Sequence, residues 1–213
     1  MTWEELKLAI QVIYSTYVGS GKLIDDTDNG TTPSSLAILA YLACNRITNY
    51  PVEFDCLKVT STISLTGASS YDLKTLFPDL KSVYQIYGIN ENQDVIYFSN
   101  KEGNITPIDG CTIKGDTLIF TGVSPTGTAT IQYKSKYAVK TVADVRQKYF
   151  LADTDYTVFD DENLIVFGIG EFINWYTDSK EQDRKAEVHN WFLEAKNNLI
   201  LHNKNTAQIS SFL

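Results

Sequence analysis

The feature of this sequence that most constrains its fold is a change of texture near residue 51, which reverses near residue 138. On both sides of this stretch, apolar residues recur every three or four positions, which is the spacing of an amphipathic helix. Between the two points the chain is rich in Thr, Val, Ile and Tyr and has frequent turn residues, a pattern typical of short strands. The sequence therefore predicts a β domain inserted between helices.

The helices that flank this insertion must hide their apolar faces, and we expect them to pack on each other. The predicted fold is α+β, with a helical bundle core built from the N- and C-terminal helices and an inserted antiparallel β domain of the sandwich or barrel type. The expected boundaries are residues 1–50 and 138–203 for the helical core, 51–137 for the β domain, and 204–213 for a flexible C-terminal tail.

Helix signals are clear at the N-terminus. Thr2 and Glu5 have the spacing of a capping box, which predicts that the first helix starts at once. A second helix is expected from Thr32 to about Ile47, and it is apolar nearly all round, which favours burial. Further helices are expected at Thr141–Phe150, Asp160–Tyr176 and Ala186–Leu201.

Seven short strands are expected in the β region. Gly115 and Asp116 lie between two of them, and a glycine in the first turn position favours a hairpin with a type II′ turn. The expected strands are Val52–Val59, Ser61–Leu65, Ser82–Ile89, Val95–Ser99, Cys111–Lys114, Thr117–Phe120 and Thr128–Tyr133.

Composition narrows the classes of function. Hydrophobic residues make up 43% of the chain, so a sizeable core can form. The formal net charge of −8 argues against binding to a nucleic-acid backbone, which requires clustered Lys and Arg. The N-terminus has no signal-peptide pattern, and the longest apolar run, Leu36–Cys44, is far too short to cross a bilayer. We expect a soluble, intracellular chain without a membrane partner.

Metal and cofactor signals are weak. The cysteines are Cys44, Cys56 and Cys111, an odd number at unrelated spacings, and His189 and His202 lie thirteen residues apart. This arrangement argues against a zinc site. Gly19-Ser-Gly-Lys22 lacks both the first glycine and the hydroxyl residue of a phosphate-binding loop. We therefore expect no metal, no cofactor and no catalytic residues, and hence no enzyme.

Two acidic clusters need separate interpretation. The loop Asp25–Gly30 resembles a calcium loop, but Leu36 stands where the bidentate glutamate belongs, so a solvated loop is favoured, with a weak ion site as the alternative. Asp160, Asp161 and Glu162 stand at the start of an expected helix, where carboxylates complement the helix dipole. Helix capping is therefore favoured there over a catalytic carboxylate pair. Among the tryptophans, Trp3 is the possible interface anchor, and Trp175 and Trp191 are expected in the core.

The order of these elements resembles the head-to-tail adaptor proteins of tailed bacteriophages, also called connector or neck proteins. The β insertion is larger than the one in the smallest members of that family. The features that carry the resemblance are the opening Thr2-Trp-Glu-Glu-Leu6 helix, the buried second helix, the segments Ile113–Phe120 and Ile131–Tyr137, the helix with Phe167-Gly-Ile-Gly-Glu-Phe172, and a last helix with Ala186, Trp191 and Leu199.

This resemblance implies a structural virion protein at the neck, made in the host cytoplasm. Such adaptors form a ring of identical copies, usually a dodecamer, beneath the portal protein. The ring extends the DNA channel and offers a platform to tail or nozzle proteins, while DNA passes without specific binding. In this family the C-terminal segment typically embraces the portal, which here implies Lys204, Gln208, Ile209, Phe212 and Leu213. Possible channel-facing acidic residues are Asp25, Asp26 and Asp28.

Two alternatives stay open at this point. The chain can be a phage-associated binding module whose β domain recognises a glycan or a peptide, with Tyr84, Tyr87 and Tyr97 along a groove. A hydrolase that uses the acidic cluster at 153–162 is the third hypothesis.

Overall fold

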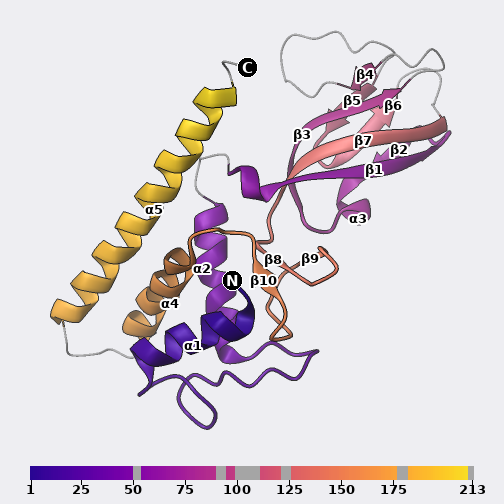
Figure 1. Cartoon of the computed structure of the whole chain (residues 1–213). Helices are drawn as coiled ribbons and strands as arrows, with labels where there is room; N and C mark the ends of the chain where they lie inside the picture. The colour runs from indigo at the N-terminus through magenta and orange to yellow at the C-terminus, as the bar shows by residue number, and fades with distance from the viewer. Residues whose placement is uncertain (50–53, 90–94, 99–110, 121–125, 177–181, 211–213) are drawn as a thin grey trace. The chain divides into compact units, whose positions relative to one another are not determined.

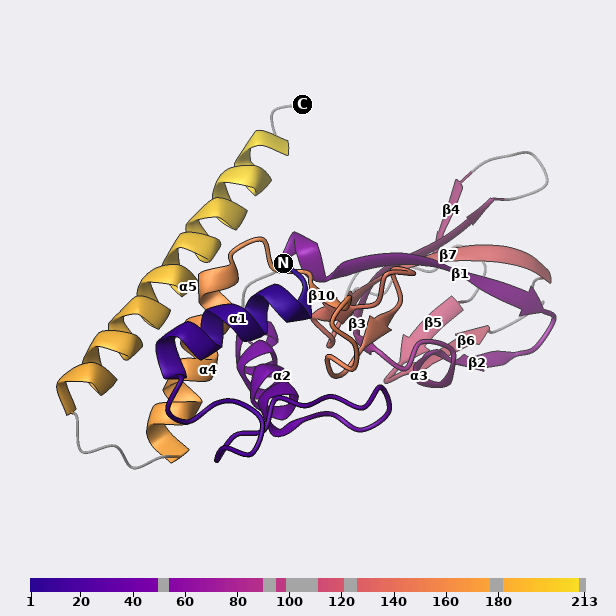
Figure 2. The same ribbon diagram turned by 60° about the horizontal axis from the view of Figure 1, so that its bottom comes forward.

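A computed structural model describes residues 1–49, 54–89, 95–98, 111–120, 126–176 and 182–210 of the 213 residues. The chain divides into two compact units, which we call unit 1 and unit 2. Unit 1 combines Met1–Leu57 with Tyr137–Leu213, and unit 2 is Lys58–Lys136. Unit 2 is therefore inserted, in sequence, between the two halves of unit 1. Figures 1 and 2 show the elements of both units from two directions.

Unit 1 begins with the helix α1, Trp3–Tyr14. The Thr2 hydroxyl accepts a hydrogen bond from the backbone N–H of Glu5, and the Glu5 carboxylate accepts one from the backbone N–H of Thr2, so the capping box is confirmed. Because a capping box satisfies N–H groups that lack partners within the helix, it fixes where the helix begins. The buried face of α1 consists of Trp3, Leu6, Ile10 and Tyr14.

The helix α2, Ser35–Thr48, starts later than the sequence predicts, because the Ser34 hydroxyl accepts the backbone N–H of Ala37 at 3.2 Å and so caps the helix. One face of α2 is buried, but Ile38 and Leu42 are exposed on another. The prediction that α2 is buried nearly all round is therefore wrong. A short 3-10 helix, η1, follows at Asp55–Leu57.

Two further helices complete unit 1. These are α4, Glu162–Tyr176, and α5, Gln182–Ser210, which lies beside α4 in both views (Figures 1 and 2). Two glycines let neighbours approach α4 closely. A Cβ added at Gly170 would overlap the Tyr14 hydroxyl of α1, and one added at Gly168 would lie 3.1 Å from the Cβ of Ala43 in α2. Close packing of α4 therefore depends on both glycines.

The helix predicted at Thr141–Phe150 does not form, and the prediction is wrong. This segment contributes to a three-stranded antiparallel sheet of β8 (Val139–Lys140), β9 (Arg146–Gln147) and β10 (Tyr156–Thr157), in the order β10-β8-β9. Asp144 stands in the turn between β8 and β9 with a φ of 61°. Its carboxylate accepts hydrogen bonds from Lys140 at 2.5 Å and from the Tyr156 hydroxyl at 2.9 Å, and these partners favour the turn over a helix.

Unit 2 has two antiparallel sheets, a short helix and its own apolar cluster. The four-stranded sheet has the order β1-β7-β3-β4 and the three-stranded sheet the order β2-β6-β5. The elements are β1 (Lys58–Thr66), β2 (Ser70–Asp72), α3 (Leu73–Leu76), β3 (Leu80–Ile89), β4 (Val95–Phe98), β5 (Cys111–Lys114), β6 (Thr117–Phe120) and β7 (Thr126–Ser135). The cluster is Ile63, Leu65, Leu73, Phe77, Leu80, Ile86, Leu118, Phe120, Ala129, Ile131 and Tyr133.

The described residues thus form an α+β fold with three small antiparallel sheets and five α-helices. The expected helical bundle core and the expected sandwich or barrel are both wrong. In unit 1 the segment Thr141–Phe150, expected to extend the bundle, contributes to a sheet, and Val139, Phe150 and Phe159 in and next to this segment belong to the core. In unit 2 the second sheet is built from strands of three or four residues, too short for a full sandwich layer, and neither sheet closes on itself.

Candidate functional site

The acidic loop Asp25–Gly30, which was expected to face a channel, is held against α1 by the side chain of Asp28. The Asp28 side chain is only 6% exposed. Its carboxylate accepts hydrogen bonds from the Trp3 indole N–H at 2.5 Å, from Lys7 Nζ at 3.4 Å and from the backbone N–H of Ser34 at 3.2 Å. Asp28 therefore joins α1 to the start of α2.

The other two acidic residues of this loop also have partners in the same unit. Asp26 accepts a hydrogen bond from the Gln11 side chain. Asp25 accepts the backbone N–H of Thr27 at 3.1 Å through its carboxylate, and the N–H of Leu36 at 3.0 Å through its carbonyl. Both are half-buried. Their exposure to a channel stays a prediction. In this structure their carboxylates form hydrogen bonds that help to hold the loop in place.

Trp3, the expected interface residue, has none of its surface exposed in unit 1. Its ring stacks on Phe150 with 4.4 Å between centroids and an interplanar angle of 10°. Trp3 is therefore packed inside unit 1 and has no surface available for contact with another protein. Among the described residues, no group of three or more His, Cys, Asp or Glu could hold a metal ion, and no helix is long and apolar enough to cross a membrane.

The side chains of the five residues expected to contact the portal are not among those that the structure describes. Lys204, Gln208 and Ile209 fall within α5, which continues to Ser210, but their side chains are not among those described, and residues 211–213, with Phe212 and Leu213, lie outside the described chain. The Tyr97 side chain is likewise outside it, while Tyr84 and Tyr87 are half-buried on β3. Portal contact and the tyrosine groove both stay predictions.

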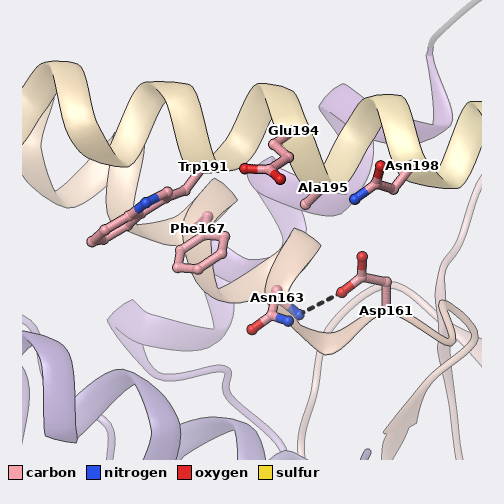
Figure 3. Close-up of a pocket in the computed structure, with 7 residues that line it drawn as sticks. All are labelled: Asp161, Asn163, Phe167, Trp191, Glu194, Ala195 and Asn198. Carbon is pink, nitrogen blue, oxygen red and sulfur yellow. Dashed lines mark hydrogen bonds between the residues drawn. The ribbon is translucent and has the colours of Figure 1, made fainter.

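A concave site in the described residues is a pocket of about 180 Å³ between α4 and α5 (Figure 3). We call it the α4–α5 pocket. Phe167 and Trp191 form its aromatic wall, with ring centroids 5.3 Å apart and ring planes tilted by 39°. Trp191 is 37% exposed, so the core position expected for it is wrong. The pocket is lined by Asp161, Asn163, Phe167, Trp191, Glu194, Ala195 and Asn198.

Two carboxylates flank this wall. Asp161, just before α4, accepts the backbone N–H of Asn163 at 3.0 Å, which confirms the capping expected at this helix start (Figure 3). Glu194 projects from α5 and is exposed. Neither makes an ion pair with a cation of the described residues. The pocket thus combines two carboxylates, two side-chain amides and an aromatic face.

An ion network with only Glu171 largely buried lies on the same helices. The Glu171 side chain of α4, 12% exposed, accepts from Arg46 of α2 and pairs with His189 of α5. The Arg46 guanidinium also lies 5.2 Å from the centre of the Phe192 ring. These contacts join three helices and hold α5 against α4, which fixes the two walls of the pocket.

Sequence reasoning missed the α4–α5 pocket. The available signal was the spacing of Trp191, Glu194 and Asn198, which places all three on one face of a helix. The apolar residues interleaved with them instead predict that Trp191 lies in the core. The pocket forms because Asp161 and Phe167, at the start of α4 and within it, lie opposite these residues of α5. The apolar periodicity of each helix does not predict which helices pack together.

Unit 1 also carries exposed apolar pairs on two helices. On α1, Leu8 and Val12 are 57% and 83% exposed, and on α2, Ile38 and Leu42 are 42% and 38% exposed. Each pair has i,i+4 spacing, so its two side chains adjoin on the helix surface. We call these pairs the α1 strip and the α2 strip. Single exposed apolar residues are ordinary, whereas large contiguous apolar surface is a feature of interaction sites.

No known protein family matches this sequence, and no curated protein matches it either.

Proposed function

We propose that this chain is a structural head-to-tail adaptor of a tailed bacteriophage, a virion protein that forms a ring beneath the portal. The ring extends the DNA channel and gives tail or nozzle proteins a platform. The proposal rests on the order of elements along the sequence, and the observation that carries it is the presence of two separate apolar strips on α1 and α2.

A ring needs two different surfaces on each copy. In a closed cyclic ring each subunit contacts the next through a heterologous interface, in which one patch meets a second, distinct patch. The α1 strip (Leu8 and Val12) and the α2 strip (Ile38 and Leu42) supply two such patches on one unit. We propose that the α1 strip of one copy packs against the α2 strip of its neighbour, because this contact removes the apolar surface of both strips from water.

The charge of the chain agrees with this role. Each copy has a formal net charge of −8. Repeated around a ring, this charge repels the phosphate backbone, so that DNA passes without binding. Like charge also opposes association of the copies, and we expect the free chain to be a monomer or a weak oligomer until the portal aligns its copies.

The experiment separates the two strips. Leu8→Glu/Val12→Glu disrupts only the α1 strip, and Ile38→Glu/Leu42→Glu disrupts only the α2 strip. In sedimentation with portal rings of the same phage, the wild-type chain is expected to add a full ring, and each double variant alone is expected to add none. Leu23→Glu, an exposed apolar position outside both strips, is the control and should assemble.

Mixing the two double variants gives the sharper test. Each retains one intact strip, so the mixture can form one heterologous contact and no more. We expect heterodimers in the mixture at high concentration and monomers in each separate sample. Assembly of either double variant at the wild-type level would rule out the strips as the ring interface.

A further inference from the structure

We propose that the α4–α5 pocket is a recognition site for an arginine side chain presented by a partner protein. The volume of the pocket, about 180 Å³, is the first reason. Sites for cofactors and drug-sized ligands usually measure roughly 300–1,000 Å³, so this pocket has room for one side chain and not for a cofactor. Its walls come from two helices that the Glu171 network holds together.

Charge complementarity selects a cation. Asp161 and Glu194 bring two carboxylates to one pocket, and neither is neutralised by a cation of the described residues. An anionic group would be repelled there. A purely apolar side chain would strip water from both carboxylates without replacing their hydrogen bonds, which is costly. A cationic side chain supplies both charge and donors.

The aromatic wall selects arginine over lysine. A guanidinium is planar, so it can stack on the exposed Trp191 ring while its N–H groups donate to the nearby carboxylate of Glu194, three residues further along α5 (Figure 3). Its five donors also suit the side-chain amide oxygens of Asn163 and Asn198, which line the same pocket. A lysine ammonium has three donors on one atom and cannot stack in this way.

We assign the arginine to another protein rather than to a copy of this chain. Of the three arginines, Arg46 binds Glu171, and Arg146 donates to the carbonyls of Tyr137 and Cys56. The third, Arg184, lies on α5 itself. The inference goes beyond the proposed ring and does not require it, because one free copy holds the whole pocket.

The experiment titrates the full-length, ¹⁵N-labelled chain with the capped tripeptide acetyl-Gly-Arg-Gly-amide. The readout is the indole N–H resonance of Trp191 in heteronuclear NMR spectra, assigned by its loss in Trp191→Phe. We expect this resonance to shift saturably. The lysine tripeptide should bind about three- to tenfold more weakly, since it loses stacking and bidentate donation. The citrulline tripeptide, which has the same shape without the charge, should give no saturable shift.

Variants locate the binding. Glu194→Gln and Asp161→Asn should each weaken the arginine tripeptide about three- to tenfold. Asparagine at 161 still caps α4, so the helix start is preserved. Glu187→Gln, an exposed carboxylate of α5 outside the pocket, is the matched control and should bind as the wild type does.

Three results would overturn the proposal. These are equal binding of the citrulline and arginine tripeptides, wild-type affinity in Glu194→Gln combined with Asp161→Asn, and the absence of any Trp191 shift at millimolar tripeptide. Loss of self-association in Arg184→Ala, with the tripeptide blocking association of the wild type, would show instead that a second copy supplies the arginine, and would overturn the assignment to a partner protein. None of these results depends on the portal, so a failure here is distinct from a failure of ring assembly.

Discussion

The indole N–H of Trp3 donates a hydrogen bond of 2.5 Å to the carboxylate of Asp28. The sequence suggests separate roles for these two residues, one at an interface and the other along a channel. In the folded chain they bind each other, and Lys7 Nζ adds an ion pair to Asp28 at 3.4 Å. The acidic loop is thereby attached to the first turn of α1, so both residues contribute to stability before any role in assembly.

Asp28→Ala is expected to lower the free energy of unfolding by about 2–4 kcal/mol, because it leaves the buried indole N–H and the Ser34 N–H without an acceptor. The measurement is urea denaturation followed by circular dichroism. Asp25→Ala, in the same loop, loses only a local turn bond and should cost less than about 1 kcal/mol. If both variants lost the same free energy of unfolding, the Trp3–Asp28 hydrogen bond would contribute no more to stability than the local turn bond of Asp25.

Gly170→Ala is expected to destabilise the chain by about 1–3 kcal/mol, despite the higher helix propensity of alanine, because the added methyl overlaps the buried Tyr14 side chain. Thermal unfolding measures the loss. Tyr14→Phe removes the hydroxyl that the methyl meets first, so the double variant should cost less than the sum of the two single variants. Strict additivity would contradict this contact.

Glu171→Gln is expected to cost about 1–3 kcal/mol, because it removes the charge that Arg46 and His189 share at a largely buried position. A double-mutant cycle with Arg46→Met isolates the pair from the loss of packing over Phe192. We expect a coupling free energy of about 0.5–2 kcal/mol by chemical denaturation. A coupling free energy near zero would show that apolar packing alone holds these helices together.

Cys44 and Cys56 should be unreactive in the folded chain. Burial raises the pKa of the Cys44 thiol to about 12 and that of the Cys56 thiol to about 11. An ordinary thiol titrates near about 8.5, so at pH 8 the thiolate that reacts is depleted by more than about a hundredfold at both positions. In a Cys111→Ser background, labelling by a disulfide reagent should be slow in the native state and fast in urea. Rapid native labelling would contradict this.

These raised pKa values also give stability a pH dependence. The unfolded thiols ionise first, so the contribution of both thiols is fully present below about pH 8.5 and is lost as the pH rises towards 11 and 12. Between pH 8 and 10 the wild type should therefore lose more free energy of unfolding than Cys44→Ala does. Parallel losses in the two chains would show that Cys44 does not cause the dependence.

Local signals in the sequence were reliable where a short stretch determines the outcome. The Thr2–Glu5 capping box is present, and β5 and β6 pair around Gly115, whose φ of 62° is the left-handed conformation that the glycine-first turn requires. The change of texture near residue 51 lies close to Leu57, where the first stretch of unit 1 ends, and its reversal near residue 138 lies close to Lys136, where unit 2 ends.

Elsewhere, tertiary partners decided the structure. The segment 141–150 has helical spacing of apolar residues, yet Asp144 adopts a positive φ, and Arg146 donates to the distant carbonyl of Cys56 at 2.7 Å. A single-sequence pattern contains neither partner. The same holds for the α4–α5 pocket, because the pairing of Phe167 with Trp191 appears only when α5 has packed on α4.

The discontinuous course of unit 1 has a consequence for its biosynthesis. The helix α2 ends at Thr48, whereas α4, which covers it, begins at Glu162. At roughly 5–20 residues per second, a ribosome takes about 5 to 20 s to reach the later helix. Unit 2 is synthesised completely during that interval. The apolar faces of α1 and α2 that α4 later covers stay exposed until then, and they can contact the same faces of other nascent chains on one polysome.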